Sequence, residues 1–248
     1  DYRAAFARAL LRTGSKDVPG SWQGTGRDWG NLSAAYPTRV IAENDPRLGV
    51  LATRVRARAG SNGLVSQGPA DSLHTYLGAD LAQWSLLVGR SDEARAYLGD
   101  LIAHSSSTLG QAEVFNRHQG EFGANLPPHA TAAATIVDLV RNMMVCDVRD
   151  TLEIALGGAP SWWRGARFER APTRFGVMDV SLESPEVDLR RARWGALDVP
   201  IRVRVADGER VVEVLTDRAH ASGQWIECPP GAREVTFRVV IEQVVASR

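Results

Sequence analysis

The stretch that decides the predicted fold is residues 73–102, which read LHTYLGADLAQWSLLVGRSDEARAYLGDLI. Its first half carries an apolar stripe at helical spacing, made of Leu73, Tyr76, Leu77, Leu81, Trp84 and Val88. A second helical face follows, made of Ala94, Tyr97, Leu98, Leu101 and Ile102. Ser91 is a typical N-cap for this second helix, with Asp92 and Glu93 in its first turn. Because only Gly89-Arg90-Ser91 joins the two stripes, we expect two antiparallel helices in a hairpin.

Helical spacing extends in both directions from this hairpin. Near the start of the chain, one face collects Tyr2, Ala5, Phe6, Ala9 and Leu10. Asp45-Pro46 pairs an N-cap with a proline at the first helical position, and Gly60 ends the helix that follows. A last helix is expected from Pro128 to about Met144.

Long segments rich in polar residues and glycine separate these helices, at residues 13–44, 60–71 and 106–127. Connections of this length are uncommon in compact domains unless they are functional. We therefore expect the three segments to converge on one rim of a helical toroid, where they would build a substrate cleft.

The pattern changes after Asp150, where helical spacing gives way to alternation. Val199, Ile201, Val203 and Val205 alternate with polar residues, and the strand returns through the turn Asp207-Gly208. The chain should therefore be α + β in separate domains. Residues 1–150 would form the catalytic portion, an incomplete α/α toroid of helical hairpins, and residues 151–248 a small antiparallel β-sandwich. We expect almost no strands before about residue 146 and almost no helix in the C-terminal domain.

Composition limits the partners of the chain. The 248 residues include 29 basic and 29 acidic side chains, so the formal net charge of zero offers no electrostatic footprint for nucleic acid or an anionic membrane. No apolar run approaches the roughly 18 residues that span a bilayer. Cys146 and Cys228 lie far apart and outside any CxxC spacing, so we expect buried thiols, no metal and no cofactor. The chain starts at Asp1, without a methionine and within an apparent helix, so we expect a piece of a longer protein.

Chemically reactive side chains are densest in residues 110–134, which read GQAEVFNRHQGEFGANLPPHATAAA. Glycoside hydrolysis uses two carboxylates, one as an acid and one as a base or nucleophile. Glu113 and Glu121 are candidates, although solvated loop charges would give the same pattern. His129 stands at a helix start, where a capping role suits it as well as a ligand role.

The order of motifs resembles the C-terminal half of bacterial (α/α)6-barrel glycoside hydrolases, the six-hairpin glycosidase superfamily that includes trehalase-like enzymes. The similar elements span roughly residues 1 to 180. They include Trp29-Gly-Asn-Leu, Asn44-Asp-Pro-Arg47, His74-Thr-Tyr-Leu-Gly78, Glu113 and Pro128-His-Ala-Thr-Ala-Ala-Ala134.

The resemblance implies that this chain hydrolyses glycosidic bonds in an oligo- or polysaccharide, as the C-terminal part of a larger enzyme. Glu113 matches the late catalytic carboxylate, a general base or nucleophile, with Glu121 as its rival. Asp28 and Asp80 are possible partner acids, although the resemblance places this acid more readily in a preceding half of the protein.

Carbohydrate ligands also require aromatic side chains for the apolar faces of sugar rings and planar polar groups for the hydroxyls. Aromatic residues in or beside the long segments are Trp22, Trp29, Tyr36, Tyr76 and Phe115. Trp29 and Tyr76 are the strongest candidates for stacking. Candidates for binding sugar hydroxyls are His74, Arg117, Glu121, Asn125 and His129.

Two other functions fit parts of the pattern. A polysaccharide lyase of the α/α-toroid type would use His74, Tyr76, Arg117 and Asn125 to abstract a proton beside a uronate, although the neutral charge weighs against an anionic substrate. A non-catalytic carbohydrate-binding remnant would keep the aromatic residues without the acid pair.

Overall fold

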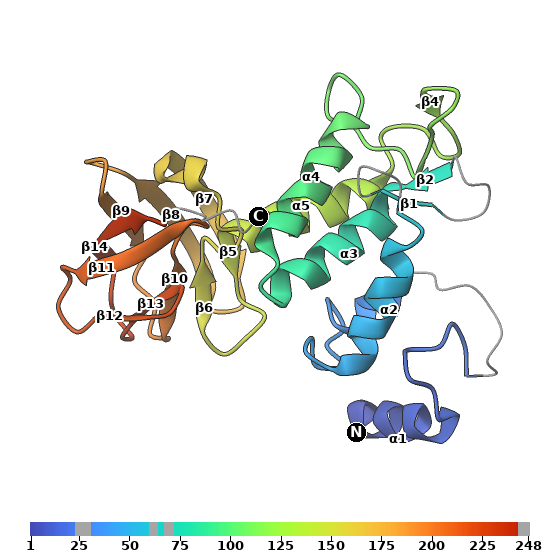
Figure 1. Cartoon of the computed structure of the whole chain (residues 1–248), viewed down its shortest axis with the longest axis horizontal. Coiled ribbons are helices and arrows are strands. Elements are labelled where there is room, and N and C mark those ends of the chain that lie inside the picture. The colour runs from blue at the N-terminus through green and yellow to red at the C-terminus, as the bar shows by residue number, and fades with distance from the viewer. Residues whose placement is uncertain (23–30, 60–63, 67–71, 243–248) are drawn as a thin grey trace, which may run out of the picture. The chain divides into compact units, whose positions relative to one another are not determined.

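The computed structural model describes residues 1–22, 31–59, 64–66 and 72–242 (Figure 1). Two compact units divide the chain, an N-terminal unit of Asp1–Leu139 and a C-terminal unit of Val140–Arg248. No helix in the described ranges is long and apolar enough to cross a membrane.

Helices of the N-terminal unit begin where the sequence supplies caps. α1 starts after Asp1, whose side chain accepts a hydrogen bond from the amide of Arg3, and ends at Gly14 with a left-handed φ of 62°. Asp45 caps α2 in the same way, and Pro46 occupies its first turn. The helical elements are α1 (Tyr2–Thr13), η1 (Asn31–Ala34), α2 (Pro46–Arg56), α3 (Thr75–Leu87), α4 (Ser91–Ala103) and α5 (Ala130–Met144), the last of which contains the boundary between the units.

α3 and α4 pack against each other and are joined by three residues (Figure 1). α3 is buried on almost every side, because small residues such as Gly78 and Ala82 allow close approach and Trp84 fills the space near its end. The indole Nε1 of Trp84 donates a hydrogen bond to the carbonyl of Glu43, 3.0 Å away, so the polar edge of this buried ring has a partner.

Short strands interrupt the helices, so the expectation of an α/α toroid of helical hairpins is wrong. Within the described ranges the N-terminal unit holds a four-stranded antiparallel sheet in the order β1-β2-β3-β4. Its strands are β1 (Val65–Ser66), β2 (Ser72–His74), β3 (Val114–Asn116) and β4 (Glu121–Phe122). Runs of two or three residues are too short to show the period-two alternation of a strand, so the sequence pattern resembled that of long loops. The expectation of a nearly strand-free N-terminal part fails for the same reason.

The C-terminal unit contains two five-stranded sheets. One has the order β12-β13-β10-β6-β5, with β5 (Val145–Cys146), β6 (Leu152–Ile154), β10 (Ile201–Arg204), β12 (His220–Ser222) and β13 (Trp225–Cys228). The other has the order β11-β14-β9-β8-β7, with β7 (Arg164–Thr173), β8 (Gly176–Glu183), β9 (Leu189–Trp194), β11 (Glu209–Val214) and β14 (Glu234–Ile241). A short helix, η2 (Pro160–Trp163), precedes β7. Among the described residues of this unit, strands pair antiparallel except for β6 with β10.

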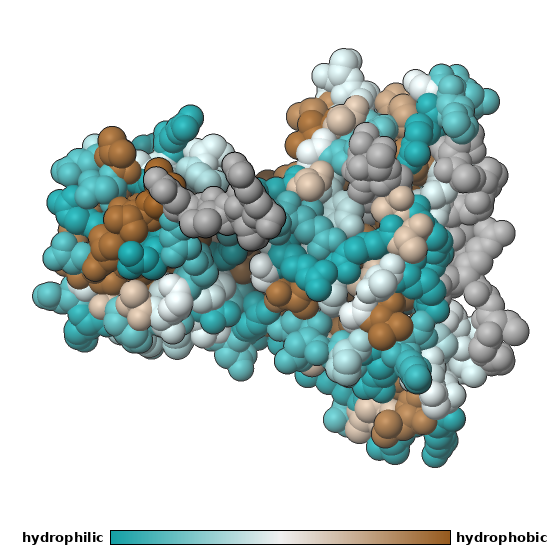
Figure 2. All heavy atoms as spheres, viewed as in Figure 1, coloured by the Kyte–Doolittle hydropathy of each residue, from teal (hydrophilic) through white to brown (hydrophobic). Residues whose placement is uncertain are grey.

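One hydrophobic core joins the inner faces of the two sheets. At its centre Trp163 meets the edge of Phe237, with ring centroids 5.5 Å apart, and both side chains are fully buried. A buried ion pair between Arg190 and Glu209 lies within the second sheet. On the outside, Figure 2 shows hydrophilic residues over much of the visible surface, interrupted by hydrophobic ones over β11 and β14, where Val212 and Ile241 are exposed.

Both cysteines of the chain are free, buried and in the first of these sheets. Cys146 ends β5 at one edge of the sheet, and Cys228 ends β13, with β6 and β10 between them. Burial is the main cause that raises the pKa of each thiol to about 12.

Candidate functional site

The backbone of Glu113 is held between two other parts of the N-terminal unit. Its amide donates to the carbonyl of Asn125 at 3.1 Å, and its own carbonyl accepts from the amide of Thr75, also at 3.1 Å. The hydroxyl of Thr75 donates to the neighbouring carbonyl of Ala112 at 2.6 Å. The first residue of α3 therefore fixes the position of Glu113, which directly precedes β3.

Polar side chains then gather on the carboxylate of Glu113. The amide Nδ2 of Asn125 donates a hydrogen bond to its Oε2. Asn125 has a φ of 52°, in the left-handed region, which asparagine adopts more readily than other non-glycine residues.

Tyr76, in the first turn of α3, lies beside the same carboxylate. Burial raises the pKa of the Tyr76 hydroxyl, and Glu113 raises it further through its charge and a hydrogen bond. Both effects favour the neutral phenol, so Tyr76 acts as a hydrogen-bond donor to an anion. His74 stands at the end of β2 with its ring 6.2 Å from that of Tyr76, edge to face.

A second carboxyl group, Asp80, belongs to the same cluster. It follows Tyr76 by one helical turn on α3, so the two side chains share a face. The charge of Asp80 contributes to the raised pKa of Tyr76, so the carboxyl lies within electrostatic range of the phenol. Asp80 keeps some solvent exposure, yet the protein atoms around its carboxyl raise its pKa to about 7 by burial. Two carboxyl groups in different surroundings, Glu113 and Asp80, thus both raise the pKa of Tyr76.

Pairing of β2 with β3 explains why residues so distant in sequence meet. His74 lies opposite Val114 in the register, and this places the residue before α3 next to the residue after Glu113. Of the residues singled out in the sequence, the structure brings together His74, Tyr76, Glu113 and Asn125.

The other candidates have different surroundings. Glu121 is exposed on β4, opposite Asn116, and within the described ranges it makes no hydrogen bond or ion pair with Glu113. The amide of His129 donates to the carbonyl of Gln111 at 2.7 Å just before α5. The ring Nδ1 of His129 is buried without a hydrogen-bond partner in the part of the chain that the structure describes. Trp29 and Asp28 lie outside the described residues.

Arg117 acts on a separate cluster around Asp100. The carboxylate of Asp100 is buried, accepts from the amide of Leu64 at 2.8 Å and lies 3.3 Å from Nδ1 of His104. Burial raises the pKa of Asp100, and the Leu64 amide, His104 and Arg117 partly offset that rise. Because His104 also packs on Phe115 at 4.7 Å, this cluster ties α4 to the strands. The spacing of Asp100 and His104, one helical turn apart, is the sequence feature that could have predicted this cluster.

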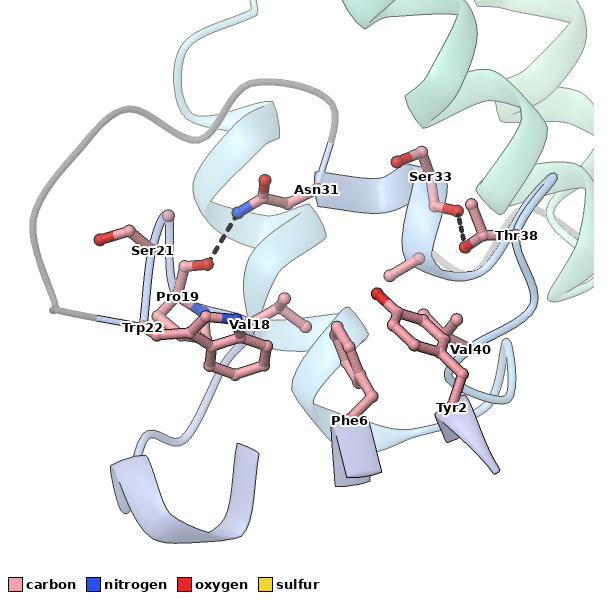
Figure 3. A pocket seen from close by; sticks show the side chains of 12 residues that line it. Tyr2, Phe6, Val18, Pro19, Ser21, Trp22, Asn31, Ser33, Thr38 and Val40 are labelled. Carbon is pink, nitrogen blue, oxygen red and sulfur yellow. Dashed lines mark hydrogen bonds between the residues drawn. The ribbon is translucent and has the colours of Figure 1, made fainter. Parts of the chain in front are cut away.

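A cavity of about 470 Å³ opens elsewhere in the N-terminal unit. Figure 3 shows the aromatic rings of Tyr2, Phe6 and Trp22 along it, with Asn31 and Ser33 among the polar groups. It shares no lining residue with the Glu113 cluster. Of its aromatic residues, the sequence had singled out Trp22 as a loop aromatic.

The C-terminal unit has a second hollow, of about 510 Å³, on strands β7 to β9. Charged side chains of both signs line this hollow, including Arg167, Arg170, Arg193, Glu169 and Asp179. Asp179 accepts a hydrogen bond from the backbone amide of Arg170 at 2.6 Å, so part of its charge is already compensated.

As for metals, the described residues contain no group of three or more His, Cys, Asp or Glu side chains placed to hold an ion.

Comparison with known proteins gives little that bears on this site. The chain matches no protein-family model and no curated protein. A solved structure with partial similarity is a GH127 β-L-arabinofuranosidase from Geobacillus stearothermophilus T6, with 12% identity and a TM-score of 0.40. The similar region covers 74% of this chain and 36% of that chain, so this chain spans well under half the length of the arabinofuranosidase. A similarity of this size supports no conclusion on fold or activity.

Proposed function

We propose that the cluster of Tyr76, Asp80, Glu113 and Asn125 hydrolyses glycosidic bonds, as part of a larger glycoside hydrolase. The observation that carries the proposal is the meeting of two carboxyl groups in unlike surroundings at one tyrosine. Hydrolysis of a glycosidic bond needs one carboxyl group that holds a proton and one that is ionised. We assign the first role to Asp80 and the second to Glu113.

Asp80 suits the role of general acid. Its burial raises its pKa to about 7, so near neutral pH a large share of the carboxyl groups keep the proton. That proton would pass to the glycosidic oxygen as the bond from this oxygen to the anomeric carbon breaks.

Glu113 suits the complementary role. Its carboxylate would take a proton from the attacking water, or would attack the anomeric carbon itself. Asn125 orients Glu113 through its hydrogen bond, and Tyr76 lies beside the carboxylate as a neutral donor. His74 would bind sugar hydroxyls at the edge of the cluster.

The same geometry weighs against a polysaccharide lyase. A lyase that used Tyr76 as its base would need a phenolate near neutral pH. Burial and the adjacent Glu113 both raise the pKa of Tyr76 and disfavour that form.

The test measures reducing ends released from soluble xylan, arabinan, mixed-linkage β-glucan and dextran, with ultraviolet absorbance recorded for unsaturated products. Glu113→Gln and Asp80→Asn should each lower kcat by about 10²- to 10⁴-fold, because each removes a proton-transfer group while keeping its shape. Glu121→Gln is the matched control and should retain nearly full activity.

Three outcomes would overturn the proposal. Hydrolysis that persists in Glu113→Gln but is lost in Glu121→Gln would move the chemistry to Glu121. Unsaturated products that absorb in the ultraviolet would identify a lyase. If the larger enzyme cleaves none of these polysaccharides, the cluster is left with a binding role in place of catalysis.

A further inference from the structure

The cavity near the start of the chain has an aromatic wall. Tyr2 and Phe6 are one turn apart on α1, and their ring centroids are 6.2 Å apart. The ring of Trp22 meets that of Phe6 edge to face at 5.2 Å. Tyr2 is 70% exposed and Trp22 49% exposed, so this wall presents aromatic surface to solvent at the mouth of the cavity.

Uncharged polar groups form other parts of the lining (Figure 3). Nδ2 of Asn31 donates to the carbonyl of Pro19 at 3.0 Å and ties η1 to the segment before Trp22. Oδ1 of Asn31 makes no hydrogen bond with residues of the described ranges. The hydroxyl of Thr38 donates to the carbonyl of Ser33 at 2.6 Å, and this hydrogen bond holds two lining residues together.

The chemistry of the lining restricts the ligand. None of the twelve lining residues carries a charge near neutral pH, so an ionic ligand would lose hydration without gaining a counter-charge. A purely apolar ligand would cover Asn31 and Ser33 and leave their polar atoms without partners. A ligand with an apolar face and several hydroxyls satisfies both conditions. The volume of about 470 Å³ lies within the range of about 300 to 1,000 Å³ typical of small-ligand sites.

We propose that this cavity binds a neutral saccharide, with a sugar ring stacked on Trp22 and its hydroxyls bound by Asn31 and Ser33. The site is separate from the Glu113 cluster and does not depend on catalysis there. Its effect would be to hold a neutral polysaccharide on the protein.

Affinity electrophoresis tests this directly. The chain is run in native gels that contain xylan, arabinan, mixed-linkage β-glucan, dextran or anionic polygalacturonate, and mobility is compared with a gel that contains no polysaccharide. At least one neutral polysaccharide should retard the chain. The gel with polygalacturonate should not retard it more strongly than that. Glu113→Gln should be retarded as strongly as the parent, which separates binding from hydrolysis.

Two variants locate the binding. Trp22→Ala should weaken the apparent affinity by about tenfold or more, because it removes the stacking surface. Tyr2→Ala is the second variant and should also weaken the affinity; because Tyr2 is exposed, its truncation should leave the fold intact. Trp225→Ala is the matched control, because it removes a partly buried tryptophan from β13 in the other unit.

Circular dichroism and melting temperature show whether each variant folds. The proposal is overturned if none of the four neutral polysaccharides retards the chain, or if polygalacturonate alone does. It is also overturned if folded Trp22→Ala and Tyr2→Ala keep the parent affinity, or if Trp225→Ala loses as much affinity as they do.

Discussion

Substitution of Asp80 by asparagine should change how the stability of the chain depends on pH. Burial raises the pKa of this carboxyl from its ordinary 3.8 to about 7 in the folded protein. Between these values the native state keeps a proton that the unfolded chain releases, so the free energy of unfolding falls as pH rises. The contribution of Asp80 to stability is therefore fully present below 3.8 and is lost as pH rises through about 7.

The size of the effect follows from the same interval. From 3.8 to about 7, the linkage amounts to about 4 kcal/mol as an upper limit. Because Asp80 keeps some solvent exposure, screening reduces this to about 2 to 4 kcal/mol. Asparagine has a similar shape and does not ionise. The stability of Asp80→Asn relative to the parent should therefore increase by that amount between about pH 4 and about pH 8.

Urea unfolding of both proteins, followed by circular dichroism at several pH values across this range, measures the difference. Asp92→Asn is the matched control, because it removes an exposed carboxylate from α4 of the same unit. A relative stability of Asp80→Asn that stays constant within about 0.5 kcal/mol over this range would refute the reasoning, since linkage would then be absent. A site that loses stability to keep a carboxyl protonated matches the trade-off between stability and activity seen in enzymes.

Three further substitutions test the packing and the ion pairs. Phe237→Ala should destabilise the C-terminal unit by about 3 to 5 kcal/mol, measured by urea unfolding, because the ring is fully buried against its neighbours. Glu209→Gln should cost about 3 to 5 kcal/mol in the same assay, because it leaves the buried guanidinium of Arg190 without its counter-ion. Burial alone would raise the pKa of Glu93, but Arg56 lowers it overall. Glu93→Gln should therefore reduce stability at pH 7, with the loss shrinking as pH falls below about 4.

Each of these expectations has a contrary result. Exposed Val177 on β8 is the control for Phe237. If both alanine variants lose the same free energy of unfolding, burial of Phe237 does not explain its loss. A double variant with methionine at Arg190 and Glu209 should recover most of the loss of Glu209→Gln; failure to recover would assign that loss to packing. A loss from Glu93→Gln that is the same at pH 3 as at pH 7 would remove the charge of Glu93 from the explanation.

The long helices were predictable because their signals are local. Asp45-Pro46 marked the start of α2, and Gly89 with Ser91 marked the link between α3 and α4, close to where the structure has them. The four short strands of the N-terminal unit were not predictable. Val114 becomes part of a strand by pairing with His74, far back along the chain, and that partner leaves no mark on the local sequence. Val65 pairs with the nearer residues Ala59 and His74, but its strand of two residues is too short to show alternation.

The candidate site, like the fold, was predictable from the sequence only in part. Glu113, Asn125 and Tyr76 were singled out by residue type and motif order, and the structure places them together; their roles stay proposals. Asp80 was predicted only as a possible partner acid, and its position on a helix weighed against that role. Its raised pKa comes from surrounding protein atoms, and these are contributed by residues whose proximity depends on the tertiary fold.

Because of where Cys146 and Cys228 lie, alkylation of their thiols can show when the sheet that contains them opens. With β6 and β10 between their strands, the thiols stand three strand spacings apart, about 14 Å. A disulfide needs Cα atoms within about 7 Å, so oxidation cannot cross-link the folded sheet. Each thiol is buried and has a pKa raised to about 12, so an alkylating reagent reacts only with molecules in which the sheet has opened. The rate of labelling under native conditions, resolved for each cysteine by mass spectrometry, would therefore show whether the edge strand β5 detaches before β13 or whether both are released in one cooperative event.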